Sequence, residues 1–114
     1  MEQEKINKII EFLEQVLEYP AMHFGAIDAV ERADSYLAGI RYGTFVLFDL
    51  DRYSIIDFHG EATTRRGHKF TPRGAIQDLK NEGYENTQIV IEIIKIEIDF
   101  WELVRNSLHK QCAE

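Results

Sequence analysis

One carboxylate in this sequence falls where a helix would otherwise be apolar. If residues 87–110 are helical, Glu97 projects away from the polar positions of that helix and lies among apolar neighbours. Those neighbours are Val90, Ile93, Ile94, Trp101 and Val104. Burial removes water from a carboxylate and raises its pKa, unless a cation or a hydrogen-bond donor compensates. The sequence offers four partners for it, namely Arg32, Arg41, His23 and His68.

Two interpretations of Glu97 follow from this placement. A carboxyl with a raised pKa could act as a general acid or anchor a ligand. It could equally be one half of a buried structural ion pair, or lie on a helix face that is simply exposed. We favour the structural interpretation, because structural ion pairs perturb carboxylates as readily as active sites do.

The only dense basic cluster of the sequence lies between residues 65 and 73. Its members are Arg65, Arg66, His68, Lys69 and Arg73. Together with free amides at the start of a helix capped by Thr71, the cluster could bind a phosphate or an acidic partner. It could also balance the charge of the acidic first helix, because it has no glycine-rich phosphate loop and no row of aromatic residues. Both interpretations stay open.

No residue pattern predicts a metal site or covalent catalysis. Asp57, His59 and Glu61 follow one another at two-residue spacing, which on a helix points successive side chains about 200° apart. Cys112 lacks the third group that would orient a Cys–His pair. We therefore expect no catalytic residue, no metal and no cofactor.

Composition limits the classes of protein that remain. The chain has 114 residues, of which 45% are hydrophobic, so residues 1–114 can form one domain around a single core. A formal net charge of −7 argues against nucleic-acid binding and against anionic membranes, since both favour basic surfaces. One cysteine and no signal-peptide pattern after Met1 indicate a reducing, cytoplasmic location.

The element expected to organise the fold is the apolar stretch of residues 87–110. Its polar positions recur every three or four residues, which is the helical period. They are Glu92, Lys95, Asp99, Glu102, Asn106 and His109. Its isoleucines favour a strand, but a strand of this length would far exceed the usual five or six residues. We therefore predict one long C-terminal helix.

The first half of the chain contains two more expected helices. The first runs from Glu4 to Tyr19 and ends at Pro20, so residues 21–25 are predicted to be a connector. Asp28 and Glu31 have the spacing of a capping box, from which a second helix runs to about Phe48. The buried stripe of this second helix is expected to comprise Val30, Ala33, Leu37, Ile40 and Leu47.

Two glycines on that second helix indicate close packing. Gly39 and Gly43 are four residues apart and share a face, so they cost helix stability but let another backbone approach. Residues 44–58 could instead form a hairpin. We prefer helix for residues 44–48, because a lone hairpin would have no sheet to complete.

The remaining elements complete an all-α prediction. A weaker helix from Tyr53 ends near Arg66, and a further helix, capped by Thr71 with Pro72 at its first position, closes at Gly83. The predicted fold is an irregular bundle of four or five helices around the long central C-terminal helix. Because that helix is apolar nearly all round, a homodimer is a further expectation.

A short motif resembles a group of small bacterial proteins. Residues 19–25, Tyr-Pro-Ala-Met-His-Phe-Gly, are similar to the Arg-Pro-Gly-Met-Tyr-Phe-Gly motif that opens these mostly uncharacterised proteins. Leu37-Ala38-Gly39 matches their following Leu-x-Gly helix, and weaker likeness extends through residues 66–68 and 83–84 to residues 96–101. Ala21 replaces the motif glycine and His23 its aromatic residue. Some of these proteins resemble immunity proteins, which bind and neutralise secreted toxins.

Two functional hypotheses follow. The resemblance and the acidic charge imply a non-enzymatic, immunity-like inhibitor that binds a basic protein such as a nuclease toxin through an acidic surface. Its candidate contacts are Glu11, Glu14, Glu18, Glu31, Asp34, Asp57 and Glu61. The alternative is a small-ligand or nucleotide-processing protein. It would gather its groups around one pocket, namely His23, Glu97, Arg65, Arg66 and His68.

Overall fold

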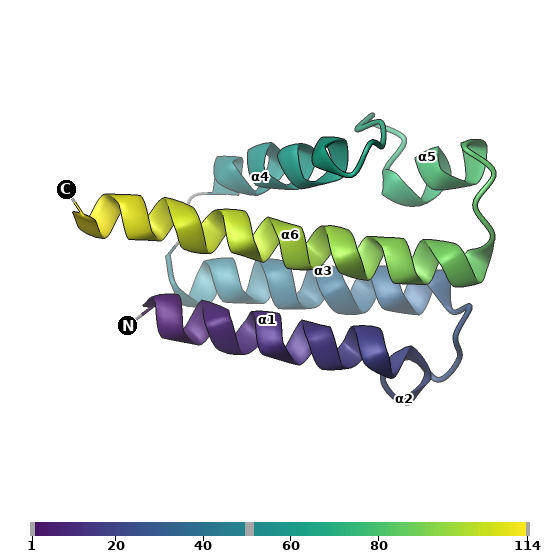
Figure 1. Cartoon of the computed structure of the whole chain (residues 1–114), viewed down its shortest axis with the longest axis horizontal. Helices are drawn as coiled ribbons and strands as arrows, with labels where there is room; N and C mark the ends of the chain where they lie inside the picture. The colour runs from purple at the N-terminus through teal and green to yellow at the C-terminus, as the bar shows by residue number, and fades with distance from the viewer. Residues whose placement is uncertain (1, 50–51, 114) are drawn as a thin grey trace.

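The C-terminal helix α6 (Asn86–Ala113) is the axis of the fold, and α1, α3, α4 and α5 all contact it. A computed structural model describes residues 2–49 and 52–113, which contain six helices and no strand. Figure 1 shows α1 and α4 on opposite sides of α6, with α3 alongside it. The all-α prediction and the central position of the long helix are confirmed.

The first helix is followed directly by a short one that the sequence did not indicate. α1 (Glu2–Glu18) buries Ile6, Ile10, Leu13 and Val16, in agreement with its apolar stripe. Residues 20–24, expected to be a connector, form α2 (Pro20–Phe24) instead. Pro20 does end α1, but its fixed φ and missing N–H suit the first position of a new helix. The bundle therefore has one helix more than expected.

The second long helix, α3 (Val30–Leu47), begins differently from the prediction. Ala29 is its N-cap residue and no side chain caps its first turn, so the capping box of Asp28 and Glu31 does not form. Val30, Ala33 and Leu37 are buried as expected. Leu47 is 81% exposed, because at the end of α3 it has passed beyond the surface that faces α6.

The choice between helix and hairpin for residues 44–58 is settled wherever the backbone is described. α3 continues to Leu47, and α4 (Arg52–Arg65) begins after a turn whose Asp49 has a φ of 54°. Leu50 and Asp51 lie outside the described residues. The predicted helix, and not the hairpin, is confirmed on both sides of that gap.

The last short helix, α5 (Ala75–Asn81), starts three residues later than expected. Thr71 does not cap it from the predicted position: the Gly74 amide donates to the Thr71 carbonyl in a turn, and the Thr71 hydroxyl binds Asp78 at 2.8 Å. The helix ends before Gly83, whose φ of 95° stops further helix.

The core is one cluster in which α6 supplies the largest side chains. Phe100 and Trp101 are fully buried, with ring centroids 5.1 Å apart. Phe45 of α3 lies 5.9 Å from each, and Phe58 of α4 lies 6.4 Å from Phe100. Side chains of three helices thus meet at adjacent positions of α6, and these positions include the neighbourhood of Glu97.

Candidate functional site

Glu97 forms a buried ion pair with Arg41 of α3. The Arg41 guanidinium donates from Nη2 to Oε1 at 2.6 Å and from Nε to both carboxylate oxygens at 3.2 Å. The Glu97 side chain is 1% exposed and that of Arg41 is 11% exposed. Of the four partners considered from the sequence, the fold selects Arg41, and the structural interpretation of Glu97 is the one that its contacts support.

The electrostatics of this pair reflect its burial. Burial raises the pKa of the Glu97 carboxyl, while the charge and hydrogen bonds of Arg41 act in the opposite direction. The Trp101 indole N–H lies close enough to lower that pKa as well, although it makes no hydrogen bond of acceptable geometry to any described residue. Each charge of this pair is therefore matched by the other inside the protein.

His59 is a neighbour of this pair that sequence reasoning did not connect with it. Its ring lies 6.1 Å from that of Phe100 and 5.9 Å from that of Phe70. Burial, and then the positive charge of Arg41, lower the pKa of His59 to about 4. The imidazole is therefore neutral at pH 7. His59 of α4 and Arg41 of α3 come near each other because both helices pack on α6, where both side chains lie against Phe100, and nothing in the local sequence signals this proximity.

The basic segment of residues 65–73 is largely matched by carboxylates of the same molecule. Arg66 donates to Glu92 at 2.5 Å and lies 3.6 Å from Asp99. His68 contacts Glu82 through Nδ1 at 3.0 Å and Glu92 through Nε2 at 2.8 Å. The segment balances charge, as one interpretation held, but the matching acids belong to α6 and the end of α5 and not to the first helix.

The position of His68 between two carboxylates favours its protonated form. A neutral imidazole has one N–H, so it can donate to only one of two carboxylates. Burial lowers the pKa of His68. The hydrogen bonds from its ring to Glu92 and Glu82 and the charges of these two groups raise it by more than burial lowers it, so the net shift is upward. Nε2 thus fastens the loop before α5 to Glu92 of α6, and Nδ1 fastens the same loop to Glu82 at the end of α5.

The other basic residues of the segment remain at the surface. Arg65 pairs with Glu61, one turn earlier on α4, at 2.8 Å, and both side chains are about half exposed. Lys69 and Arg73 are exposed. An exposed pair of this kind contributes little stability, so Arg65 and Glu61 stay available to a partner.

His23 lies in a different environment from the other residues of the alternative hypothesis. It sits on α2, with its Nδ1 3.5 Å from the Tyr36 hydroxyl and its ring 5.5 Å from that of Phe12. Glu97 contacts Arg41, and His68 contacts Glu82 and Glu92. Because Arg65 pairs with Glu61, the fold divides the five proposed pocket residues into four sets with separate partners.

The seven acidic candidates lie on three helices and all are exposed. Glu11, Glu14 and Glu18 belong to α1, Glu31 and Asp34 to α3, and Asp57 and Glu61 to α4. Because α1 and α4 lie on opposite sides of α6 (Figure 1), the seven do not form one continuous patch. Apart from the Glu61–Arg65 pair, none of them forms an ion pair with the described side chains of residues 3–49 and 55–108.

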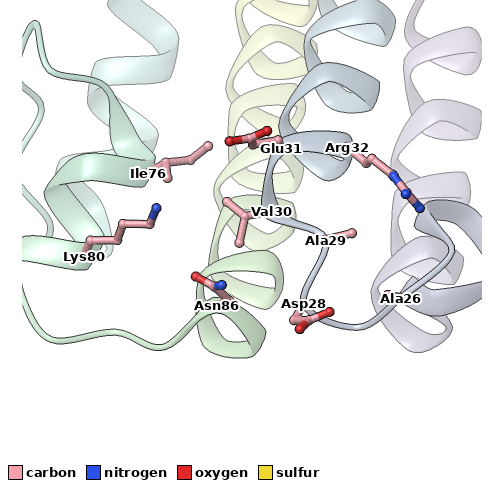
Figure 2. Close-up of a pocket in the computed structure, with 9 residues that line it drawn as sticks. All are labelled: Ala26, Asp28, Ala29, Val30, Glu31, Arg32, Ile76, Lys80 and Asn86. Atoms are coloured by element: carbon pink, nitrogen blue, oxygen red, sulfur yellow. The ribbon is translucent and has the colours of Figure 1, made fainter.

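One cavity includes an acidic candidate. About 480 Å³ in volume, it lies where the start of α3 meets α5 and the start of α6. Figure 2 shows Ile76 and Lys80 of α5 on one side and Glu31 and Val30 of α3 facing them on the other, while Arg32 points away from both. The Arg32 guanidinium donates to the Phe24 carbonyl at 3.2 Å. The polar groups of this cavity are surface side chains, so it is a shallow hollow in an exposed face.

Neither a metal site nor a membrane span is found where the structure is described. No three His, Cys, Asp or Glu side chains among residues 3–49 and 55–108, whose side chains the structure describes, are placed to hold a metal ion. Over the same residues, no helix combines the length and apolar character that crossing a bilayer requires.

The comparisons with known proteins add no further assignment. No protein-family model matches the chain, and no curated protein and no solved structure is detectably similar to it.

Proposed function

We propose that this chain is a non-enzymatic protein-binding module, an immunity-like inhibitor that neutralises a basic protein such as a nuclease toxin in the cytoplasm. The observation that carries the proposal is the state of the charges. The carboxylates of Glu97 and Glu92 are each paired with an arginine inside the molecule, whereas Glu11, Glu14 and Glu18 on α1 are exposed and form no ion pair with any residue whose side chain is described.

The position of these carboxylates on α1 supports the proposal. Glu14 and Glu18 lie toward the C-terminal end of α1, and no basic residue occupies its last turn. A carboxylate near a helix C-terminus is unfavourable, by about 0.3–1 kcal/mol, because the helix dipole is negative there. Local stability therefore does not explain them. Residues that conflict with local stability are more frequent at functional sites.

Exposed apolar side chains lie beside the acidic group. Phe12, Tyr19 and Met22 are 37%, 55% and 80% exposed, and Phe12 packs edge-on against His23. Aromatic side chains at the centre of an interface often supply most of its binding energy, and complementary charge raises the association rate. A surface of this kind suits a basic partner that carries an apolar patch. The other carboxylates of the proposal, Glu31, Asp34, Asp57 and Glu61, would then be peripheral.

The experiment is co-expression with secreted toxins encoded beside the gene of this chain. The proposal expects that the chain restores growth and co-purifies with one of them. The variant Glu11→Lys/Glu14→Lys/Glu18→Lys should then weaken the complex at least about tenfold, mainly through slower association at low salt.

Two matched variants locate the surface. Asp57→Lys/Glu61→Lys tests the acidic residues of α4, and Glu85→Lys reverses one exposed charge that is not a candidate. Both are expected to bind like the unmodified chain. If no adjacent toxin is neutralised or co-purified, the inhibitor proposal fails. If binding occurs but depends on Asp57 and Glu61, the function stands and the α1 surface is wrong.

A further inference from the structure

The exposed residues along one face of α3 include no charged side chain. The exposed residues of α3 between positions 35 and 47 are Ser35, Gly39, Tyr42, Gly43, Val46 and Leu47, which we call the α3 outer face. Tyr42, Val46 and Leu47 are 53%, 72% and 81% exposed. Tyr42 and Val46 lie on the side of α3 turned away from the buried Val30, Ala33 and Leu37, and Leu47 is exposed at the C-terminal edge of this face.

The two glycines of this face have no role in packing within the chain. The sequence predicts that another backbone approaches Gly39 and Gly43, but a β-carbon at either position would meet no other atom within 4 Å. That prediction is wrong for the described monomer. Both residues have helical backbone and no positive φ, so a turn does not require them either. An approaching backbone would have to come from another molecule.

The distribution of charge on the surface favours a second copy of the chain as this other molecule. The chain has a net charge of −7, so most of its surface repels a second copy of itself. On the α3 outer face no charge opposes self-association, and there is also none that would attract a basic or an acidic protein. Most oligomers of one chain are two-fold symmetric, and such an interface needs a self-complementary patch. A groove at Gly39 and Gly43 beside a ridge of Tyr42 and Val46 meets that requirement.

We propose that the α3 outer face binds the same face of a second copy, with two α3 helices packed across a two-fold axis. The apolar surface of α6, which first suggested a dimer, cannot serve this purpose, because α1, α3, α4 and α5 enclose it within one chain. This inference is independent of the proposed inhibitor function, since the acidic residues of α1 are not part of the α3 outer face.

The test is the mass of the purified full-length chain as a function of concentration, measured by light scattering and analytical ultracentrifugation. At roughly 100 µM the chain is expected at twice the 13.3 kDa monomer mass. Val46→Lys should weaken the dimer at least about tenfold by burying a charge. The matched control is Ile56→Lys, which changes an α4 residue that is 61% exposed and should leave the dimer intact.

A second variant separates loss of the interface from loss of the fold. Gly43→Gln replaces a poor helix former with a good one in open space, so it should raise the denaturation midpoint of the monomer. The same variant should dissociate the dimer, because its side chain fills the groove. A monomeric mass at roughly 100 µM, or a dimer that survives both Val46→Lys and Gly43→Gln, would overturn the proposal.

Discussion

Replacing Arg41 and replacing Glu97 are expected to lower the free energy of unfolding by different amounts. Arg41→Leu leaves a carboxylate that is 1% exposed without its cation, and we expect a loss of about 3–5 kcal/mol in the free energy of unfolding. Glu97→Leu should cost less, because Arg41 is 11% exposed and can turn its guanidinium toward water. The double variant Arg41→Leu/Glu97→Leu should lose far less than Arg41→Leu alone.

Denaturant titration of the four proteins measures this cycle, with fluorescence of the single, fully buried Trp101 as the signal. The coupling energy between the two substitutions isolates the pair. A loss below about 1 kcal/mol for Arg41→Leu would mean that Glu97 does not depend on Arg41 in the folded state.

His68 makes stability depend on pH in the opposite direction from His59. The folded pKa of His68 is raised above 6.5, so the native state retains a proton that the unfolded chain has lost. The stabilisation is complete below pH 6.5 and disappears as the pH rises through the folded pKa. The folded pKa of His59 is about 4, so stability rises with pH between about 4 and 6.5.

The measurement is the free energy of unfolding from pH 4 to 9. His68→Gln should flatten the decline above pH 6.5 and leave the acid limb in place, whereas His59→Asn should flatten the acid limb. An unchanged alkaline limb in His68→Gln would show that the contacts with Glu82 and Glu92 do not fix the protonation state of His68.

At the scale of the elements, the spacing of polar and apolar residues was sufficient to predict the long helices, but the residues expected to cap a helix did not predict where it begins. The apolar stripe of α1 and the three-to-four-residue polar spacing of α6 follow from which side of each helix faces the core, so the sequence carries them directly. The start of α3 does not: Asp28 and Glu31 have the spacing of a capping box, but the chain enters the helix at Ala29. Backbone geometry decides whether such a box can close, and spacing alone does not encode it.

The candidate site was predictable to the same limited extent. The apolar surroundings of Glu97 were visible in the sequence, because they belong to the same helix. The choice of Arg41 among four cations was not, since it depends on how α3 packs against α6 over a separation of 56 residues. The same holds for Glu92 as the common partner of Arg66 and His68.

Two aspartates test the helix boundaries. The capping box predicts a loss of about 1 kcal/mol for Asp28→Ala, whereas the observed start of α3, without a side-chain cap, predicts a change within about 0.5 kcal/mol. Asp78 is buried and accepts hydrogen bonds from the Thr71 amide and hydroxyl. Asp78→Ala should therefore cost about 1–3 kcal/mol. Thermal denaturation measures the loss of stability in both variants. For Asp28→Ala, a loss near 1 kcal/mol would favour the capping box over the observed start of α3 without a side-chain cap.

For the whole molecule, the acidic residues of α1 are expected to lower the stability of the fold while they favour the binding of a basic partner. Glu14 and Glu18 are four residues apart, so they repel each other, and both lie near the unfavourable end of the helix dipole. Glu11→Gln/Glu14→Gln/Glu18→Gln removes three of the negative charges of a chain whose net charge is −7. We expect the variant to be more stable than the unmodified chain by roughly 1 kcal/mol at low salt.

Salt distinguishes this cause from a change in packing. Raising the ionic strength from about 0.01 to 1 M shortens the screening length from roughly 30 to 3 Å, so repulsion among exposed charges weakens while the buried Arg41–Glu97 pair is little affected. The unmodified chain should therefore gain stability with salt, and the triple variant should gain less. A variant that is more stable by the same amount at every salt concentration would point to better helix propensity, and the acidic surface of α1 would then carry no electrostatic cost for a partner to relieve.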